Sequence, residues 1–368
     1  MHAFTPSDFE IIKVRAWEID IPLRDEFVIS RGSVTTAQSV FVRVELRGGA
    51  VGFGECAPFG AVTGEDRATS LRTLNDLRDI VIGQTAFRLR PISRQLGEAA
   101  PDNPAARCGL ETAILDALCR AAGIPTWEYF GNVTRQDYET DITLPILGVD
   151  RCLARAREWY RQGFRTLKVK VGIDLDADLA TIERIAAELA DISFVIDANQ
   201  GFSESDALSL IRSLERAKID VRLLEQPLHK DDLEGMARLR REASFDLCAD
   251  ESVDSVRDVA LIARTGAADV VNIKIMKSGV YEAFEMAVTA LASGLGIMFG
   301  GMIETRLAMG CSLAMAAGLG GAHTLDLDTP LLMATDPLDG GYRYEGPRMH
   351  LWTAPGLGTI PRNVSESQ

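Results

Sequence analysis

The sequence of 368 residues has little of what would tie it to nucleic acid, to a membrane or to a disulfide framework. Basic residues are outnumbered by acidic ones, and the formal net charge of −14 disfavours nucleic acids and anionic membrane surfaces as partners. The six cysteines are scattered without a CxxC pair, as expected of free thiols in a reducing compartment. The first residues lack the basic segment and apolar core of an export signal, so we expect a cytoplasmic protein.

Long uncharged runs and paired histidines are scarce as well. Residues 307–325 contain no Asp, Glu, Lys or Arg, but Ala and Gly dominate them and Ser312 and His323 interrupt them. A buried barrel helix that runs into a strand therefore explains this stretch better than a membrane span. The four histidines show no paired spacing, which argues against a zinc site.

Two patterns of apolar residues divide the chain. Residues 11–56 alternate apolar and polar side chains like antiparallel strands, and the spacing from 65 to 122 is helical and ends at Gly123. Beyond residue 140 a short apolar strand followed by an amphipathic helix recurs, with candidate strands at 141–147, 166–171, 193–198, 221–225, 245–250, 269–275, 296–301 and 323–328. This alternation predicts an α/β fold with a closed parallel barrel.

Polar residues lie at the ends of five successive candidate strands. In chain order they are Lys168 and Lys170, Asp197 and Asn199, Glu225, Asp250, and Lys274. The intervals between strands each match one strand–helix unit, so these side chains are expected at one level of the barrel. The carboxyl ends of barrel strands are where active sites are built. A single Asp at a strand end is commonly a turn former, but the ordered set favours a catalytic interpretation.

Three of these residues, Asp197, Glu225 and Asp250, predict a metal site. Buried like charges are costly unless a cation compensates them. Ligands that are all oxygen select a hard ion, Mg²⁺ or Mn²⁺, over zinc or copper.

The lysines suggest proton transfer next to a carboxylate. Strands two and six of an eight-stranded barrel lie roughly opposite one another, so a metal-bound substrate would have Lys170 on one face and Lys274 on the other. A lysine base must be neutral, and we expect burial, Lys168 and the metal to lower its pKa. The metal would stabilise the enediolate that forms when the α-proton leaves.

The motifs LKVKVG, IDANQGF, LLEQPL, CADES and VNIKIMKSG resemble those of the enolase superfamily, in its muconate-lactonizing-enzyme subgroup. This superfamily is a known example of a Lys base that works with Mg²⁺. The resemblance implies a modified (β/α)7β TIM barrel at 136–330 and an α+β cap at 1–135, to which 331–368 return. It also implies that Asp197, Glu225 and Asp250 bind Mg²⁺. Lys170 and Lys274 would be the acid/base pair, and Lys168 would contact the substrate carboxylate or tune Lys170.

The later motif LDLDTPLLMATDPLDGG resembles the dipeptide epimerases of this subgroup, whose Asp-x-Asp binds the substrate's α-ammonium. Here that pair is Asp326 and Asp328, although their spacing alone fits a turn before Thr329 and Pro330 equally well. Lactonizing, succinylbenzoate-forming and N-acylamino-acid-racemizing relatives act on substrates without a free ammonium. Sugar-acid dehydratase relatives use a late barrel histidine, which strands six and seven lack here.

Three further residues are candidates for substrate contact. Arg31 lies in residues 27–34, which match the family's mobile loop, and either pairs with an acidic substrate side chain or is solvated. Glu304 either favours a cationic dipeptide or is a structural acceptor, and it precedes Thr305 where the family has serine. Asn199 can converge on the site together with Asp197.

We therefore predict an isomerase, a Mg²⁺-dependent dipeptide epimerase that moves a proton at the α-carbon of the C-terminal residue. Its partners would be a small-molecule substrate and further copies of the chain in a homo-oligomer, with no nucleic acid and no membrane. Within catalysis, the alternatives are an N-acylamino-acid racemase, an o-succinylbenzoate synthase or a muconate-type cycloisomerase. The alternative outside catalysis is a metal-stabilised sensor or pseudoenzyme.

Overall fold

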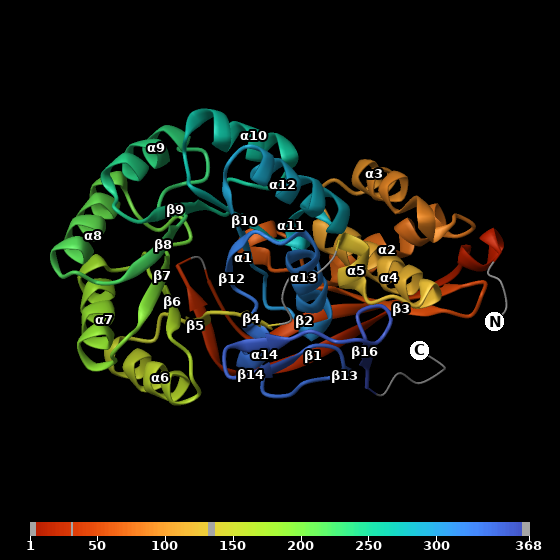
Figure 1. Cartoon of the computed structure of the whole chain (residues 1–368), viewed down its shortest axis with the longest axis horizontal. Coiled ribbons are helices and arrows are strands. Elements are labelled where there is room, and N and C mark those ends of the chain that lie inside the picture. The colour runs from red at the N-terminus through yellow and green to blue at the C-terminus, as the bar shows by residue number, and fades with distance from the viewer. Residues whose placement is uncertain (1–4, 31, 132–136, 363–368) are drawn as a thin grey trace.

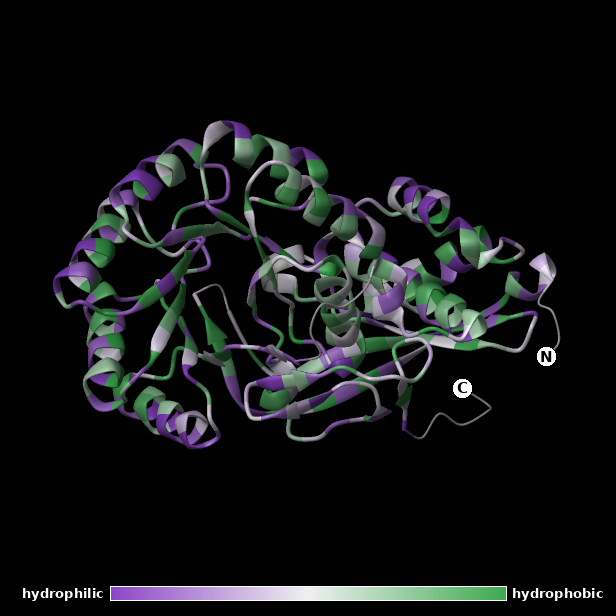
Figure 2. Ribbon diagram, in the orientation of Figure 1, coloured by the Kyte–Doolittle hydropathy of each residue, from purple (hydrophilic) through white to green (hydrophobic). Residues whose placement is uncertain are grey.

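The structure, a computed structural model, describes residues 5–30, 32–131 and 137–362, without the side chains of residues 61 and 62. Figure 1 shows a curled sheet ringed by helices on one side of the molecule and an antiparallel sheet covered by helices on the other. Strands are mostly hydrophobic, whereas the ring helices are hydrophilic on their outer faces (Figure 2). This is the distribution that buries one face of each helix against the sheet.

The antiparallel sheet begins the cap. It has the order β1-β2-β3. Its strands are β1 (Ile11–Ile29), β2 (Gly32–Leu46) and β3 (Val51–Cys56), preceded by η1 (Pro6–Phe9). The helices that follow are α1 (Gly60–Thr63), α2 (Arg67–Val81), η2 (Ala86–Arg88), α3 (Leu89–Ala99), α4 (Pro104–Ala122) and α5 (Thr126–Phe130). A Cβ added at Gly54 would lie 2.0 Å from the carbonyl oxygen of Gly109, so glycine lets α4 pack directly on β3.

The second sheet has eight parallel strands in the order β12-β11-β10-β9-β8-β7-β6-β5. They are β5 (Ile142–Leu144), β6 (Thr166–Lys170), β7 (Ser193–Asp197), β8 (Val221–Glu225), β9 (Asp246–Ala249), β10 (Val270–Ile273), β11 (Gly296–Phe299) and β12 (Ala322–Leu325). The predicted (β/α)7β alternation is confirmed. Most strands end earlier than predicted. For example, Lys274 lies at the N-cap position of the next helix, and Asp326 follows the end of β12.

The helices that connect these strands form the outer ring. They are α6 (Val149–Arg161), α7 (Leu175–Glu188), α8 (Glu204–Arg216), α9 (Leu233–Glu242), α10 (Val256–Thr265), α11 (Ile275–Ser278), α12 (Val280–Ala292) and α13 (Arg306–Leu319), with α14 (Thr329–Leu332) after β12. Several begin at a side chain that accepts a backbone N–H of the first turn, as Asp174, Ser255 and Thr305 do. The uncharged run predicted as a barrel helix and strand is α13 followed by β12.

The first and last barrel strands meet where the sheet closes. The Asp141 N–H, just before β5, donates to the Leu325 carbonyl at 3.0 Å, and the Thr140 hydroxyl accepts from the Leu327 N–H at 2.9 Å. Inside the barrel, an apolar layer from five neighbouring strands lies below the polar residues of the site: Val195, Leu223, Cys248, Val270 and Met298.

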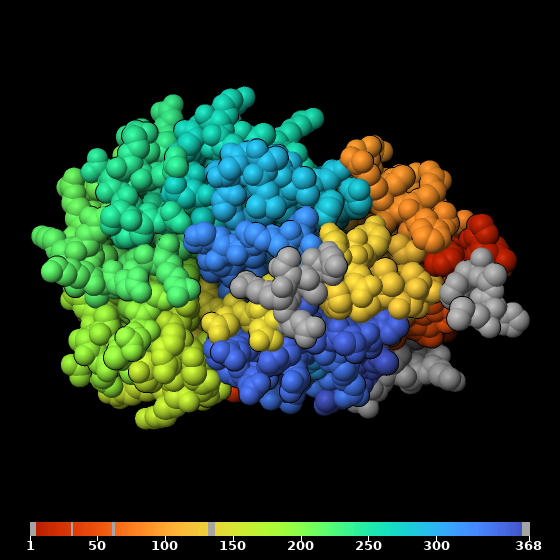
Figure 3. Space-filling view, in the orientation of Figure 1, coloured from red at the N-terminus to blue at the C-terminus, as the bar shows by residue number. Residues whose placement is uncertain are grey.

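The C-terminal tail runs back over the cap. Its strands are β13 (Leu338–Gly340), β14 (Arg343–Glu345), β15 (Arg348–His350) and β16 (Thr359–Pro361), and β15 pairs with β4 (Asp137–Glu139). The Leu357 N–H donates to Asp116 of α4, and the Thr126 N–H to the Gly356 carbonyl. In Figure 3 the tail, in blue, lies against both the yellow-green start of the barrel and the yellow cap helices. The domain limits at 135 and 331 remain predictions.

Two predictions about composition can be compared with the described part of the chain. All six cysteines are buried and free, as predicted from their spacing. Among the described helices, none is long and apolar enough to cross a membrane.

Candidate active site

The hairpin of β1 and β2 covers the mouth of the barrel. The Ser30 hydroxyl donates to the carbonyls of Ala198 and Asn199 at 3.2 Å each, and the Val28 carbonyl accepts from the Ile146 N–H. In the segment predicted as a mobile loop, Phe27, Val28 and Ile29 pair with Val34, Ser33 and Gly32, and its mobility remains a prediction. The predicted contact Arg31 lies outside the described residues.

Beneath this hairpin a cleft brings the predicted polar residues together. Lys168, Lys170, Asn199, Lys274 and Asp326 all line it. Because β6 and β10 are separated by three strands, Lys170 and Lys274 approach the cleft from opposite walls. A wider cleft between cap and barrel is lined by other residues and contains none of these three lysines.

The remaining wall of the cleft is apolar. Phe27 and Ile29 come from the cap hairpin, Phe59 from the segment before α1, and Met302 and Ile303 from the loop between β11 and α13. Ile29 and Ile303 belong to a small hydrophobic cluster that ties the hairpin to the barrel. The cleft thus combines charged residues from the ends of the barrel strands with apolar residues from the cap and from the loop before α13.

Strand register explains why the charged residues share one level. Lys170 is the Cα partner of Asp197, and Asp197 is the partner of Glu225 on the next strand. The backbone turns sharply just beyond, since Asn199 has φ +42° and Gln226 has φ +36°. Left-handed conformations at such residues are costly and are concentrated at functional sites.

Each predicted metal ligand contacts a lysine ammonium group. Lys168 Nζ lies 3.1 Å from Asp197 and 2.7 Å from Glu225, and Lys170 Nζ lies 2.5 Å from Asp197. Lys274 Nζ donates to Asp250 Oδ2 at 2.7 Å. These ammonium groups balance carboxylates that are almost completely excluded from solvent.

Lys277 is a functional candidate that the sequence reasoning missed. Its Nζ donates to Asp250 Oδ1 at 2.8 Å and to the Asp250 carbonyl, and its side chain is buried. The available signal was its position three residues after Lys274, which places both side chains on one face of a single helical turn.

Burial and neighbouring carboxylates have opposite effects on the pKa values of two of these lysines. Burial alone would lower the pKa of Lys168, but Asp326, Glu225 and Asp197 outweigh it and hold that pKa well above its usual value. Burial would also lower the pKa of Lys274, but the carboxylates of Asp250 and Glu225 outweigh burial, so this pKa is raised as well. The expected lowering of the base's pKa depends on a bound metal ion and remains a prediction.

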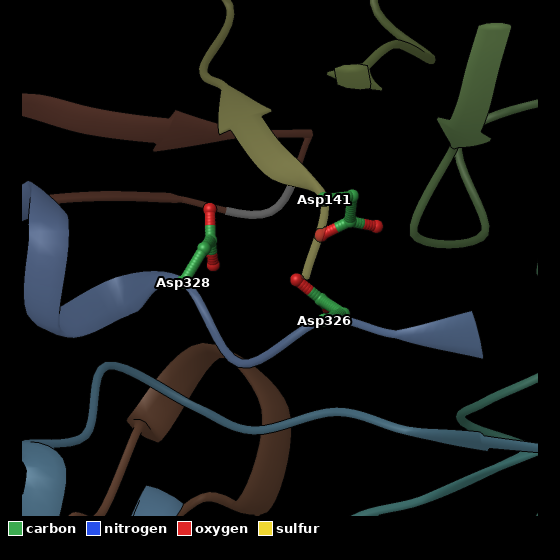
Figure 4. Close-up of side chains that lie close together, drawn as sticks. All are labelled: Asp141, Asp326 and Asp328. Atoms are coloured by element: carbon green, nitrogen blue, oxygen red, sulfur yellow. The ribbon is translucent and has the colours of Figure 1, made fainter. Parts of the chain in front are cut away.

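Asp326 and Asp328 form a cluster with a third residue, Asp141 (Figure 4). One oxygen from each carboxylate lies within 4.8 Å of the others, and all three side chains are buried. Asp326 Oδ2 accepts from Lys168 Nζ at 2.7 Å, and Asp328 Oδ2 accepts from the Thr143 N–H at 2.5 Å. Asp141 was missed because it precedes its strand, and only closure of β5 against β12 brings it to the site.

Glu304 lies behind the cleft instead of lining it. Its Oε1 accepts from the Met302 N–H at 2.7 Å, and burial raises its pKa to about 8. The neighbouring Thr305 caps α13 and donates its hydroxyl to Glu55 of the cap at 2.6 Å. This environment favours the structural interpretation of Glu304, and its contact with substrate remains a prediction.

Comparisons with known proteins agree with this arrangement. Residues 11–131 match the mandelate racemase / muconate lactonizing enzyme N-terminal domain, and residues 151–363 match the enolase C-terminal domain-like family. An aromatic dipeptide epimerase of Herpetosiphon aurantiacus is 38% identical over 96% of this chain and 99% of its own length. An N-succinyl-L-Arg/Lys racemase of Bacillus cereus is 30% identical over 95% of each chain.

A solved structure extends the likeness. It is a dipeptide epimerase from Enterococcus faecalis V583, complexed with Mg and the dipeptide L-Leu-L-Tyr. Its TM-score is 0.91 at 32% identity, with 95% of this chain and 99% of that chain covered. Epimerases and racemases are isomerases, and the chain belongs to that enzyme class. By sequence and by fold, the chain is a member of the mandelate racemase / muconate lactonizing enzyme family of the enolase superfamily.

Proposed function

We propose that the chain epimerises dipeptides in a Mg²⁺-dependent reaction. The α-proton of the C-terminal residue would leave on one face of the substrate, and a proton would return on the other. The observation that carries this proposal is the placement of Lys170 and Lys274 on opposite walls of one cleft that Asp326 also lines. Two bases on opposite faces of one carbon are what inversion by 1,1-proton transfer requires.

Asp197, Glu225 and Asp250 are the residues that would hold the ion. They offer only oxygen ligands from adjacent strands and are at most 1% exposed, which suits a hard divalent cation. Their charges are balanced by the same lysines that are needed for proton transfer. A cation at these carboxylates would therefore weaken the influence that raises the lysine pKa values. When bound, Mg²⁺ would polarise the substrate carboxylate and balance the charge that develops on it.

The lysines would divide the proton transfer between them. For an L residue, Lys170 removes the α-proton and the electron pair moves into the carboxylate to give an enediolate. Lys274 then protonates the opposite face, so that the product is the D epimer and no atom is gained or lost. Lys168, which reaches both Asp326 and Glu225, would position the substrate carboxylate.

Asp326 supports a substrate with a free amino terminus. It is the member of the predicted Asp-x-Asp pair that lines the cleft, and it is 6% exposed. A carboxylate there gains a charge-assisted hydrogen bond from an ammonium group, whereas an N-acyl group offers no charge to pair with it. The N-acylamino-acid racemase alternative therefore predicts little effect of Asp326→Asn, and the epimerase predicts a large one.

The apolar wall of the cleft supports dipeptides with apolar side chains. Phe27, Ile29, Phe59 and Ile303 would contact a substrate side chain with carbon atoms only. An acidic or basic side chain would lose hydration against such a wall, and these four side chains offer it no polar partner. The relative named an aromatic dipeptide epimerase agrees with this preference.

The experiment that tests the proposal is proton–deuterium exchange of pooled L,L-dipeptides in D₂O with Mg²⁺, followed by mass spectrometry. The expected result is a mass gain at the C-terminal α-carbon for dipeptides with apolar or aromatic side chains. A folded, Mg²⁺-loaded protein that gives no mass gain in any pool would overturn the dipeptide assignment. Magnesium-dependent melting without any exchange would instead support the sensor or pseudoenzyme alternative.

A further inference from the structure

Asp141 is a buried carboxylate to which the proposed chemistry gives no task. It lies at the closure between β5 and β12 and is 2% exposed. Neither of its carboxylate oxygens has a hydrogen-bond partner among the described residues, and Oδ1 of the neighbouring Asp328 has none either. A buried carboxylate without partners destabilises the fold, so a sequence selected for stability alone would favour an amide or an apolar residue here.

The dimensions of the cluster suit an ammonium group. Its three oxygens lie within 4.8 Å of one another, so a point between them is within about 2.8 Å of each, the usual N⁺–H···O⁻ separation. Figure 4 shows the carboxylates of Asp141, Asp326 and Asp328 converging on this space.

The charges at the cluster also call for a cation. Among the described residues, the one ammonium group within hydrogen-bonding distance of its carboxylates is that of Lys168, which Asp326 shares with Asp197 and Glu225. Burial and the neighbouring carboxylates raise the pKa of Asp141 well above its ordinary value and that of Asp328 to about 7. A positive charge that enters the cluster would offset this unfavourable burial.

The cluster is adjacent to the cleft. Asp326 and Thr143 line the cleft, and the Thr143 N–H holds Asp328 directly behind them. A substrate ammonium that reaches Asp326 is therefore next to the space that the other two carboxylates enclose.

We propose that Asp141 is a specificity-determining residue, the third carboxylate of the site that selects substrates with a free α-ammonium over N-acylated ones. This inference rests on the proposed dipeptide epimerisation and adds a residue to it. With an ammonium in place, the carboxylates of Asp141 and Asp328 acquire a compensating charge. With a neutral N-acyl group they stay uncompensated, and the buried like charges disfavour that complex.

The test measures binding by calorimetry with two probes, Ala-Phe and N-propionyl-phenylalanine, each as a mixture of epimers with Mg²⁺ present. The probes differ only in the ammonium group, and a mixture already at equilibrium releases no heat of epimerisation. Wild-type protein should bind Ala-Phe more tightly. Asp141→Asn should reduce that preference roughly tenfold or more, mainly through weaker binding of Ala-Phe, since a charge-assisted contact is lost.

Two controls separate this role from a structural one. Asp116→Asn removes another buried carboxylate, far from the cleft, and should leave the preference unchanged. Asp141→Asn should melt no lower than wild type, because it removes a like charge, and Asp141→Ser is a second neutral variant should the amide not be accommodated. Asp141→Glu, which keeps the charge, should restore part of the preference.

The outcomes are distinguishable. Loss of the preference in Asp141→Asn and its retention in Asp116→Asn support the inference. If Asp326→Asn loses the preference but both neutral Asp141 variants keep it, the inference is overturned while dipeptide epimerisation stands. A wild-type protein without any preference for the ammonium probe overturns both.

Discussion

Buried carboxylates occur in the cap and in the barrel, but they face different partners. In the cap, Glu55 accepts from the Thr305 N–H and hydroxyl and from the Ser39 hydroxyl. Asp116 accepts from the backbone of Phe53 and Leu357 and from the Arg120 guanidinium. At the site in the barrel, Asp197 and Glu225 contact lysine ammonium groups, and both oxygens of Asp141 lack a partner among the described residues.

This contrast separates structural acids from functional ones. A carboxylate that accepts several backbone N–H groups stabilises the place where two segments meet, and in this protein those segments belong to the cap, the barrel and the tail. A carboxylate whose partners are mainly lysine ammonium groups, or which lacks a partner, is available for a ligand. Burial alone therefore does not mark an active-site acid, whereas the kind of partner does.

The largest expected effect is that of Glu225→Gln. Losing a proposed Mg²⁺ ligand should reduce kcat/KM by roughly a thousandfold or more, because a Lewis-acid contribution is worth several kcal/mol. The melting temperature should stay the same or rise, since the pKa of Glu225 is already raised to about 7 by burial and by Asp197. Steady-state kinetics and thermal melting at several Mg²⁺ concentrations check the expected loss of kcat/KM and the expected melting temperature. Wild-type turnover in this variant would contradict the metal assignment.

The matched change in the cap, Glu55→Gln, should give the opposite pattern. An amide cannot accept from all of its present donors, so the free energy of unfolding should fall by about 1–3 kcal/mol. Turnover per folded molecule should stay within severalfold of wild type. Urea unfolding, with activity corrected for the folded fraction, measures this. If turnover disappears while stability is intact, the division between structural and functional acids is wrong.

Asp326→Asn is expected to lower kcat/KM for the best dipeptide by about a hundredfold, the value of a lost charge-assisted contact. The same variant should change kcat/KM for N-acylamino acids little, whatever their starting rate. Steady-state assays on matched substrates, one with a free amino terminus and one with an N-acyl group, provide the measurement. Equal losses on both substrate types would point to a structural role for Asp326.

Glu304→Gln should alter the pH dependence of stability. The folded pKa of Glu304 is raised to about 8 from an ordinary value of 4.5, so its ionisation opposes folding. The wild-type protein should lose stability as pH rises from about 4.5 towards 8, by up to about 1.4 kcal/mol per pH unit, and the variant should lack this component. The stability of the variant relative to wild type should grow between pH 5 and 8. If the free energies of unfolding of the wild type and the variant change with pH in parallel, Glu304 is not a buried carboxyl with a raised pKa.

Much of the fold follows from local patterns in the sequence. Most barrel strands are buried on both faces and give short apolar runs, whereas most ring helices are buried on one face and give a period of about 3.6 residues. The alternation of strands and helices could therefore be located from apolar spacing. The predicted ends of the strands were less accurate, because the end of a strand depends on where the following helix begins. Lys274, for example, was predicted within a strand, but it is the residue before α11.

The site could be predicted only where one strand carries the information. Lys170, Asp197 and Glu225 were found because parallel register places strand ends at one level. Asp141 and the closed hairpin depend on contacts between segments far apart in the sequence, and no spacing rule indicates them. The raised lysine pKa values could not be predicted from the sequence because they depend on how many carboxylates surround each ammonium group.

The most direct test of the central claim is deuterium exchange from separate L and D epimers of an active dipeptide with Lys170→Ala and Lys274→Ala. The account predicts that Lys170→Ala loses exchange from the L epimer by roughly 10²–10⁴ while the D epimer still exchanges without inversion. Lys274→Ala should show the mirror pattern. Intact exchange from the L epimer in Lys170→Ala would contradict the assignment of the two lysines to opposite faces.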